Sequence, residues 1–179
     1  MEKVLFILLF LQSIFLNGQD NDPWTVYMSP AAVHELFAKY TGAFQLEIEM
    51  SGMNEPIKIG SMHQMILGGR FLELKQKGSM MGMDYEALST IGFNTIDQTV
   101  SMTAITNMGT GTLALQGLWD EQTKTANLRG KLTNPVSKKT MNVRQTIQFA
   151  DANTILIDNY DQEENHPERK TIQYKFVRK

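Results

Sequence analysis

The chain has 179 residues, of which 42% are hydrophobic and 20% are charged, and its formal net charge is −2. This composition is typical of one ordinary globular domain, and 17 basic residues against 19 acidic ones argue against a nucleic-acid partner. The absence of cysteine excludes a disulfide framework, thiol chemistry and a lipid-modified cysteine.

Residues 1–18 have the pattern of a signal peptide. Lys3 precedes an apolar run over residues 4–16, and small or polar residues follow at 17–19. We expect export, with cleavage after Gly18, to the periplasm or out of the cell. The alternative is a retained membrane anchor, but the run falls short of the roughly 20 residues that span a bilayer. The mature chain then has no stable membrane span.

A short helix is expected after a polar N-terminal extension at residues 19–28. Ser29 is placed to cap this helix, Pro30 suits its first turn, and Gly42 is placed to end it. Apolar residues recur at helical spacing, namely Val33, Leu36, Phe37 and Tyr40. Their stripe must be buried, so we expect the helix to plug one mouth of the following domain or to pack on its wall.

From residue 44 onward the apolar period changes to two, which is typical of β-strands. Ten runs follow, at residues 44–50, 57–65, 70–74, 85–93, 100–106, 113–119, 126–132, 141–149, 155–157 and 172–176. Gly68-Gly69 is expected to form a two-residue hairpin turn, and no connection is long enough for a crossover helix. The sequence therefore predicts an all-β fold over residues 29–179, an antiparallel up-and-down β-barrel of about ten strands with one short N-terminal helix. Its interior either encloses a ligand or is filled by side chains.

Three segments resemble one bacterial family. They are ILGGRFLELKQKGSMMGMDYEALSTIGFN (66–94), TNMGTGTLALQG (106–117) and TNPVSKKTMNVRQTIQF (133–149). The family is catalogued as domain of unknown function 1579, and the likeness runs from residue 28 to residue 179. It implies a lipocalin-like, calycin-type barrel, in the broad group that includes fatty-acid carriers and haem-binding nitrobindins. It implies no catalytic residue.

The candidate ligand-binding residues are polar or aromatic side chains on the parity that faces the barrel interior: Arg70, His63, Tyr85, Gln145, Tyr174 and Trp119. Arg70 is able to hold a carboxylate or phosphate head group by paired hydrogen bonds, or else lies at the rim with its head in water. His63 lies where a haem-ligating histidine of a nitrobindin-like barrel would point, although a hydrogen-bonded core histidine is the commoner case. Haem is therefore kept as an alternative cofactor.

No catalytic or metal-binding signature occurs in the sequence. A paired acid and base, a nucleophile elbow and a zinc helix are all missing. Met80, Met81 and Met83 suit Cu(I), but methionine is frequent throughout the chain, which favours adaptable packing. His34 and His166 are expected at the surface. No catalytic residue, metal site or required cofactor is predicted.

These observations favour an exported, non-enzymatic barrel that binds a small apolar or amphipathic molecule. One alternative is a small enzyme that uses the same cavity. The other is a barrel with a filled interior and a structural or protein-interaction role. The sequence carries no signal for an oligomeric state.

Overall fold

The computed structural model describes residues 22–179, and strands make up most of this part of the chain. The ten strands are β1 (Gly42–Met50), β2 (Ile57–Ile66), β3 (Phe71–Met80), β4 (Met83–Phe93), β5 (Thr99–Thr106), β6 (Leu113–Asp120), β7 (Thr125–Thr133), β8 (Thr140–Asp151), β9 (Thr154–Gln162) and β10 (Arg169–Arg178). The predicted signal peptide and residues 19–21 of the predicted extension lie outside the described residues.

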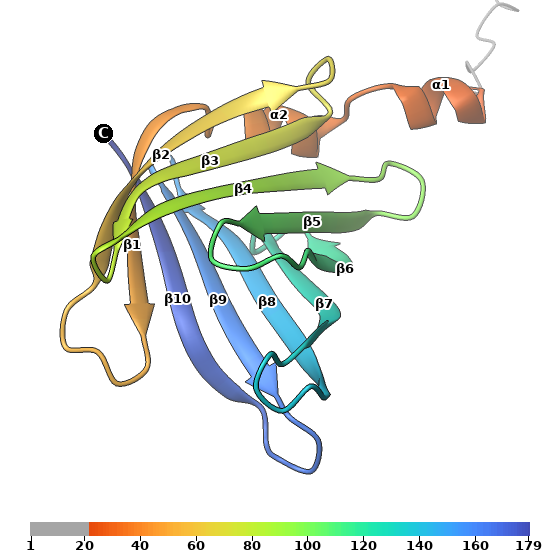
Figure 1. The fold of residues 1–179 in the computed structure, drawn as a ribbon. Helices are drawn as coiled ribbons and strands as arrows, with labels where there is room; N and C mark the ends of the chain where they lie inside the picture. The colour runs from red at the N-terminus through yellow and green to blue at the C-terminus, as the bar shows by residue number, and fades with distance from the viewer. Residues whose placement is uncertain (1–21) are drawn as a thin grey trace, which may run out of the picture.

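Every strand pairs antiparallel with its neighbours in sequence, and β1 also pairs with β10, so the sheet closes into a barrel (Figure 1). Closure leaves no unpaired sheet edge exposed. The predicted up-and-down barrel is confirmed, with a strand at each of the ten predicted runs. The runs at 70–74 and 155–157 were too short, since β3 and β9 continue toward the far end of the barrel.

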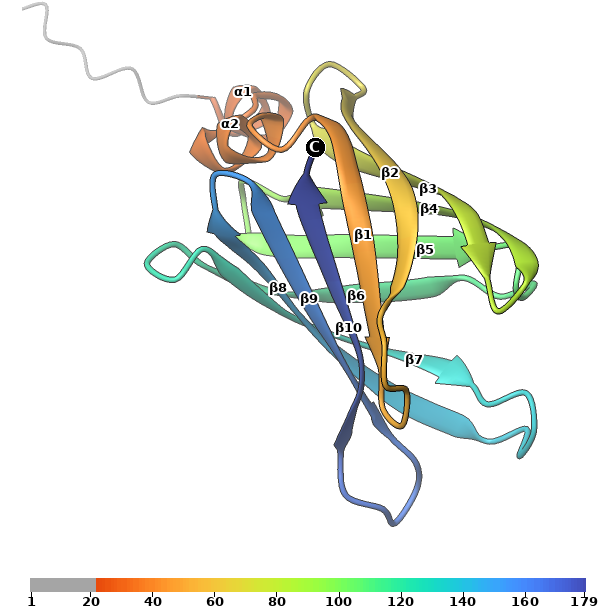
Figure 2. The ribbon, with the colours of Figure 1, turned by 90° about the vertical axis from the view of Figure 1, so that its left-hand side faces the viewer.

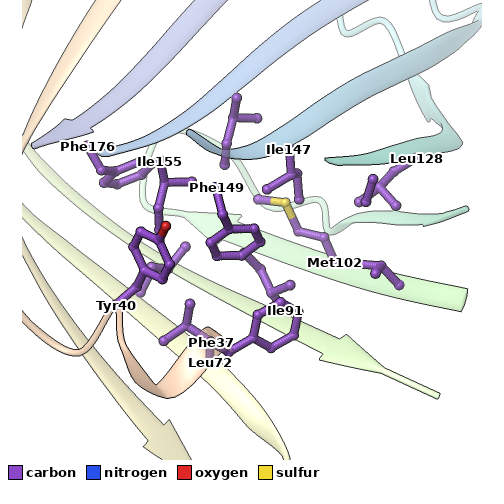
Figure 3. Packing of buried hydrophobic residues seen from close by; sticks show 14 of the residues in the cluster. Phe37, Tyr40, Leu72, Ile91, Met102, Leu128, Ile147, Phe149, Ile155 and Phe176 are labelled. Atoms are coloured by element: carbon purple, nitrogen blue, oxygen red, sulfur yellow. The ribbon is translucent and has the colours of Figure 1, made fainter. Parts of the chain in front are cut away.

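The hydrophobic core lies inside the barrel, as the period-two pattern predicts. Alternate residues of neighbouring strands pair across the sheet, for example Leu72 with Ile91, and Ile91 with Met102. Figure 3 shows that these side chains point into one shared interior together with Leu128 and Ile147. The ring of Phe149 lies among them and faces Phe37 from the N-terminal segment.

Two short helices precede the barrel, α1 (Pro23–Met28) and α2 (Ala32–Ala38). The predicted capping of the second helix by Ser29 is wrong. Its N-cap is Ala31, and Nδ1 of His34 accepts a hydrogen bond of 2.9 Å from the Ala31 N–H. Ser29 instead ends α1, in the segment that the sequence analysis treated as an extension. Within residues 22–179, no helix is long and apolar enough to cross a membrane.

Helix α2 closes one end of the barrel (Figure 2). Phe37 is fully buried and stacks on Phe149, with ring centroids 5.1 Å apart, while the Tyr40 hydroxyl donates a hydrogen bond of 2.6 Å to the carbonyl of Asp151. His34 is also buried, against Phe93, so its predicted surface position is wrong. The expectation that the apolar stripe plugs a mouth of the barrel is confirmed.

The connection between β2 and β3 differs from the predicted two-residue turn. It comprises residues 67–70, with positive φ at Leu67, Gly68 and Gly69. Arg70 therefore belongs to the turn and is exposed. Its guanidinium donates to the carbonyl oxygens of Gly68, at 3.2 Å, and of Met28 at the end of α1. The prediction that Arg70 faces the interior is wrong, because the strand parity applies only from Phe71 onward, and the exposed position agrees with the alternative of an arginine at the rim.

Candidate functional site

A cavity of about 900 Å³ occupies the end of the barrel away from α2. At its outer side it is bordered by the exposed loop between β5 and β6, residues 107–112. Inward it reaches core side chains that include Leu46, Leu74 and Phe176. The buried rings of Phe37, Tyr40 and Phe149 therefore occupy the half of the barrel next to α2, here called the packed half, and the cavity lies in the other half.

Apolar side chains form much of the cavity wall, among them Met102, Leu113 and Ile157. Among the described residues that line the cavity, Lys131 is the one charged residue, and it is exposed at the end of β7. Three of the six predicted ligand-binding residues line this cavity, namely Tyr85, Gln145 and Tyr174. These three side chains thus lie on the inner face of the barrel, as their strand parity predicts.

Gln145 is the most unusual polar residue of the wall. It is only 3% exposed, and its Nε2 donates a hydrogen bond of 2.9 Å to Oδ1 of Asn159 on the neighbouring strand. Its Oε1 is buried and has no hydrogen-bond partner within the described part of the chain. An unpaired buried acceptor costs free energy, so this oxygen is a candidate contact for a bound molecule.

A chain of hydrogen bonds determines which way the Gln145 amide points. The Asp161 carboxylate accepts from Nδ2 of Asn159 at 2.9 Å and from the Thr171 hydroxyl at 2.8 Å. Because an ionised carboxylate only accepts, Asn159 must turn its NH₂ toward Asp161 and its Oδ1 toward Gln145. Gln145 then has to present its NH₂ to Asn159, which leaves its Oε1 as the free group.

Two tyrosines add hydroxyl groups to the cavity wall. Burial raises the pKa of Tyr174, and the charge of Asp161 and the neighbouring Tyr85 act in the same direction. Burial also raises the pKa of Tyr85, although the Thr106 hydroxyl beside it acts in the opposite direction. Both phenols are therefore protonated at neutral pH and are able to donate hydrogen bonds.

His63 lies outside the cavity, in the packed half of the barrel. Its Nδ1 is 3.1 Å from the Tyr40 carbonyl and its Nε2 is 2.9 Å from the Ser61 hydroxyl. Since a carbonyl only accepts, Nδ1 carries the proton and Ser61 donates to Nε2. Burial lowers the pKa of His63 to about 4. Both ring nitrogens are engaged, so His63 has no free nitrogen with which to ligate haem.

Trp119 and Arg70 also lie away from the cavity. Trp119 packs edge-on against Phe37 at the plugged end, and its Nε1 donates a hydrogen bond of 2.7 Å to Glu121. Trp119 lines a separate groove between the barrel rim and the segment of α1 and α2. Arg70 is held by backbone carbonyls in its turn. The structure does not bring His63, Trp119 or Arg70 together with the other three candidates.

Two buried polar residues connected with the site, Gln76 and Asn159, were missed in the sequence. Gln76 lines the cavity, and Asn159 orients Gln145 from behind. Gln76 follows Leu74 on the inward parity of β3, and Asn159 follows Ile157 on the inward parity of β9. The predicted runs of these two strands ended too soon, at Leu74 and at Ile157. Following each alternation for two more residues would have found them. Among residues 22–179, no group of three or more His, Asp or Glu side chains is placed to hold a metal ion.

Comparison with known proteins identifies the family of the chain. A comparison with curated proteins found no match. A solved structure described as a redesigned β-barrel is similar, with a TM-score of 0.46 and 9% sequence identity, over 80% of this chain and 94% of that one. Residues 29–178 match the family described as "Protein of unknown function (DUF1579)". This match spans the whole barrel and its helical plug, and the chain therefore belongs to the DUF1579 family.

Proposed function

We propose that the protein is exported and that it binds one small apolar or amphipathic molecule inside its barrel. The cavity of about 900 Å³ carries the proposal of binding, and the apolar run over residues 4–16 after Lys3 is the reason to propose export. Its volume falls within the range of roughly 300–1,000 Å³ that is common for small-molecule sites. A largely apolar wall with a few convergent polar groups is also characteristic of such sites.

The chemistry of the wall favours binding over catalysis. Apart from the exposed Lys131, the titratable side chains of the described wall are Tyr85, which is buried, and Tyr174, which is partly buried, and burial raises the pKa of each. A general base needs a pKa near the working pH, and a phenol that stays protonated does not meet that requirement. Within residues 22–179, the wall therefore offers hydrogen-bond donors and acceptors but no buried group suited to take up a proton near neutrality.

Uptake of a fluorescent apolar probe tests the proposal. N-phenyl-1-naphthylamine brightens in apolar surroundings, and we expect it to saturate at one molecule per chain of ligand-free protein. The variant Ala104→Phe places a large side chain on the inward face of β5, at the cavity wall, and we expect it to abolish uptake. The matched control is Ala114→Phe on the exposed face of β6, which should bind the probe like wild type.

Two outcomes would contradict the proposal. Wild-type protein that takes up no probe would mean that the barrel does not bind apolar molecules. Unchanged uptake by Ala104→Phe, with a circular dichroism spectrum and a urea midpoint like those of wild type, would place the bound probe outside the cavity.

A further inference from the structure

We propose that the polar end of the bound molecule is an uncharged group that donates a hydrogen bond, such as an alcohol, and that Oε1 of Gln145 accepts this bond. The inference rests on the proposed function and names the chemical class of its ligand. It starts from Oε1 of Gln145, which is the one side-chain oxygen within the described residues that is buried and has no hydrogen-bond partner.

The direction of the Gln145 amide determines that the ligand must donate. Asp161 orients Asn159, and Asn159 orients Gln145, through hydrogen bonds that are each 2.9 Å long. Reversing the Gln145 amide would place two oxygens against each other, because Oδ1 of Asn159 would then face Oε1. An ether, an ester or a carboxylate has no hydrogen to offer to Oε1, whereas a hydroxyl or an amide N–H does.

The charges around the cavity argue for a neutral head group. The polar network ends at the carboxylate of Asp161, whose charge contributes to raising the pKa of Tyr174. Lys131 is exposed on the outward parity of β7 and does not accompany Gln145 into the interior. A buried carboxylate needs a paired cation or several donors, and a fatty-acid head group beside Gln145 would find an acceptor, a nearby negative charge and no buried cation, with only the tyrosine hydroxyls of the wall as donors.

Tyr174 complements Gln145 as a donor. Its partner on β9 is Ile157, two residues before Asn159, so Tyr174 and Gln145 lie diagonally across β9 on the same inner face. A ligand hydroxyl donates and accepts at once, so it suits a wall that pairs the Gln145 oxygen with the Tyr174 hydroxyl.

Three molecules with ten carbon atoms each distinguish a hydrogen-bond donor, an acceptor without a donor and a negative charge at the polar end, in wild-type protein. Each is used to displace N-phenyl-1-naphthylamine at pH 7.5. 1-Decanol has a donor, methyl nonyl ether has the same length without a donor, and decanoate has a negative charge. We expect decanol to displace the probe at about tenfold lower concentration than the ether, the value of one buried hydrogen bond, and decanoate to be the weakest of the three.

Two variants then test whether the preference for decanol over the ether comes from Oε1 of Gln145. Gln145→Met keeps the length of the side chain and removes its acceptor, so we expect decanol and the ether to compete equally. Gln148→Met makes the same change on the exposed face of β8 and should keep the tenfold preference. The comparison in wild-type protein tests the donor requirement by itself, even where Gln145→Met does not fold.

The outcomes distinguish this inference from the proposed function. Probe uptake with decanoate or the ether competing as well as decanol would overturn the inference and leave the proposed function standing. A preference for decanol that persists in folded Gln145→Met would overturn the role of Oε1. Absence of any probe uptake would overturn both.

Discussion

The imidazole of His63 stacks on the ring of Phe44, with centroids 4.1 Å apart and planes within 10° of parallel. The pair lies in the packed half of the barrel, and Phe176 meets the imidazole edge-on at 5.2 Å. The Arg178 guanidinium lies 4.7 Å from the centroid of the Phe44 ring. A neutral imidazole suits this apolar contact, whereas an imidazolium would be desolvated and would lie near a second cation.

This contact predicts that the protein loses stability in mild acid. Burial and, to a smaller extent, Arg178 lower the pKa of His63 from 6.5 to about 4. Between these two pH values the unfolded chain binds a proton that the folded chain does not, so the free energy of unfolding falls as the pH is lowered. The fall from this group approaches about 3 kcal/mol at pH 4. Urea unfolding at intervals from pH 7.5 to pH 4 measures it.

The contribution of His63 is isolated by comparing slopes. His34 is also buried with a lowered pKa, and it acts in the same direction. In His63→Asn, which is still able to donate to the Tyr40 carbonyl, the free energy of unfolding should depend less steeply on pH than in wild type. His166→Asn, at an exposed position, should leave the slope unchanged. Equal slopes in His63→Asn and wild type would refute the assignment.

Removing the Phe37 side chain from the helical plug should destabilise the whole barrel. Phe37 is fully buried between Phe149 and Trp119, so Phe37→Ala removes a large apolar side chain and leaves a cavity. We expect a loss of about 3–5 kcal/mol in the free energy of unfolding, measured by urea denaturation. Glu35→Ala, on the exposed side of the same helix, should change it little. A small effect of Phe37→Ala would mean that α2 detaches from the barrel without unfolding it.

Strands β6 and β7 approach so closely that only glycine fits at position 117. A Cβ added to Gly117 on β6 would overlap the backbone carbonyl of Asn127 on β7, and backbone is unable to move aside as a flexible side chain does. Gly117→Ala should therefore cost at least about 2 kcal/mol in the free energy of unfolding. Gly109→Ala, where a Cβ meets nothing within 4 Å, is the control and should be nearly neutral. Thermal unfolding of the two variants measures the difference. If Gly117→Ala is as neutral as Gly109→Ala, the close approach of the strands does not require glycine at position 117.

The loop between β9 and β10 is anchored by Arg144. Its guanidinium makes hydrogen bonds of 2.7–3.0 Å to both carboxylate oxygens of Glu168, and it lies 3.7 Å from the centroid of the Tyr160 ring. Lysine reproduces neither the paired geometry nor the planar stacking, so Arg144→Lys should cost about 1 kcal/mol and speed proteolysis of residues 163–168. Lys139→Ala breaks a pair with Glu164 that is largely exposed on both sides, and it should have little effect on either measurement.

The alternation in the sequence identified all ten strands and the inward face of most of their side chains. Side chains alternate between the two faces of any strand, so the period-two pattern identified Tyr85, Gln145 and Tyr174 as interior residues before the strand partners were known. Short connections excluded parallel pairing, which left a closed antiparallel barrel as the simplest way to protect the sheet edges.

The position of a residue along the barrel axis, the turn at Arg70 and the cavity are not contained in the alternation and depend on the tertiary structure. Alternation tells inside from outside but not the height along the barrel axis, so His63 and Gln145 were equivalent in the sequence although one is packed under the plug and the other borders a cavity. Arg70 was misplaced because a turn residue next to a strand is able to match its parity by chance. The cavity depends on the summed volumes of side chains from all ten strands, and His34 became buried only because the barrel rim lies against α2.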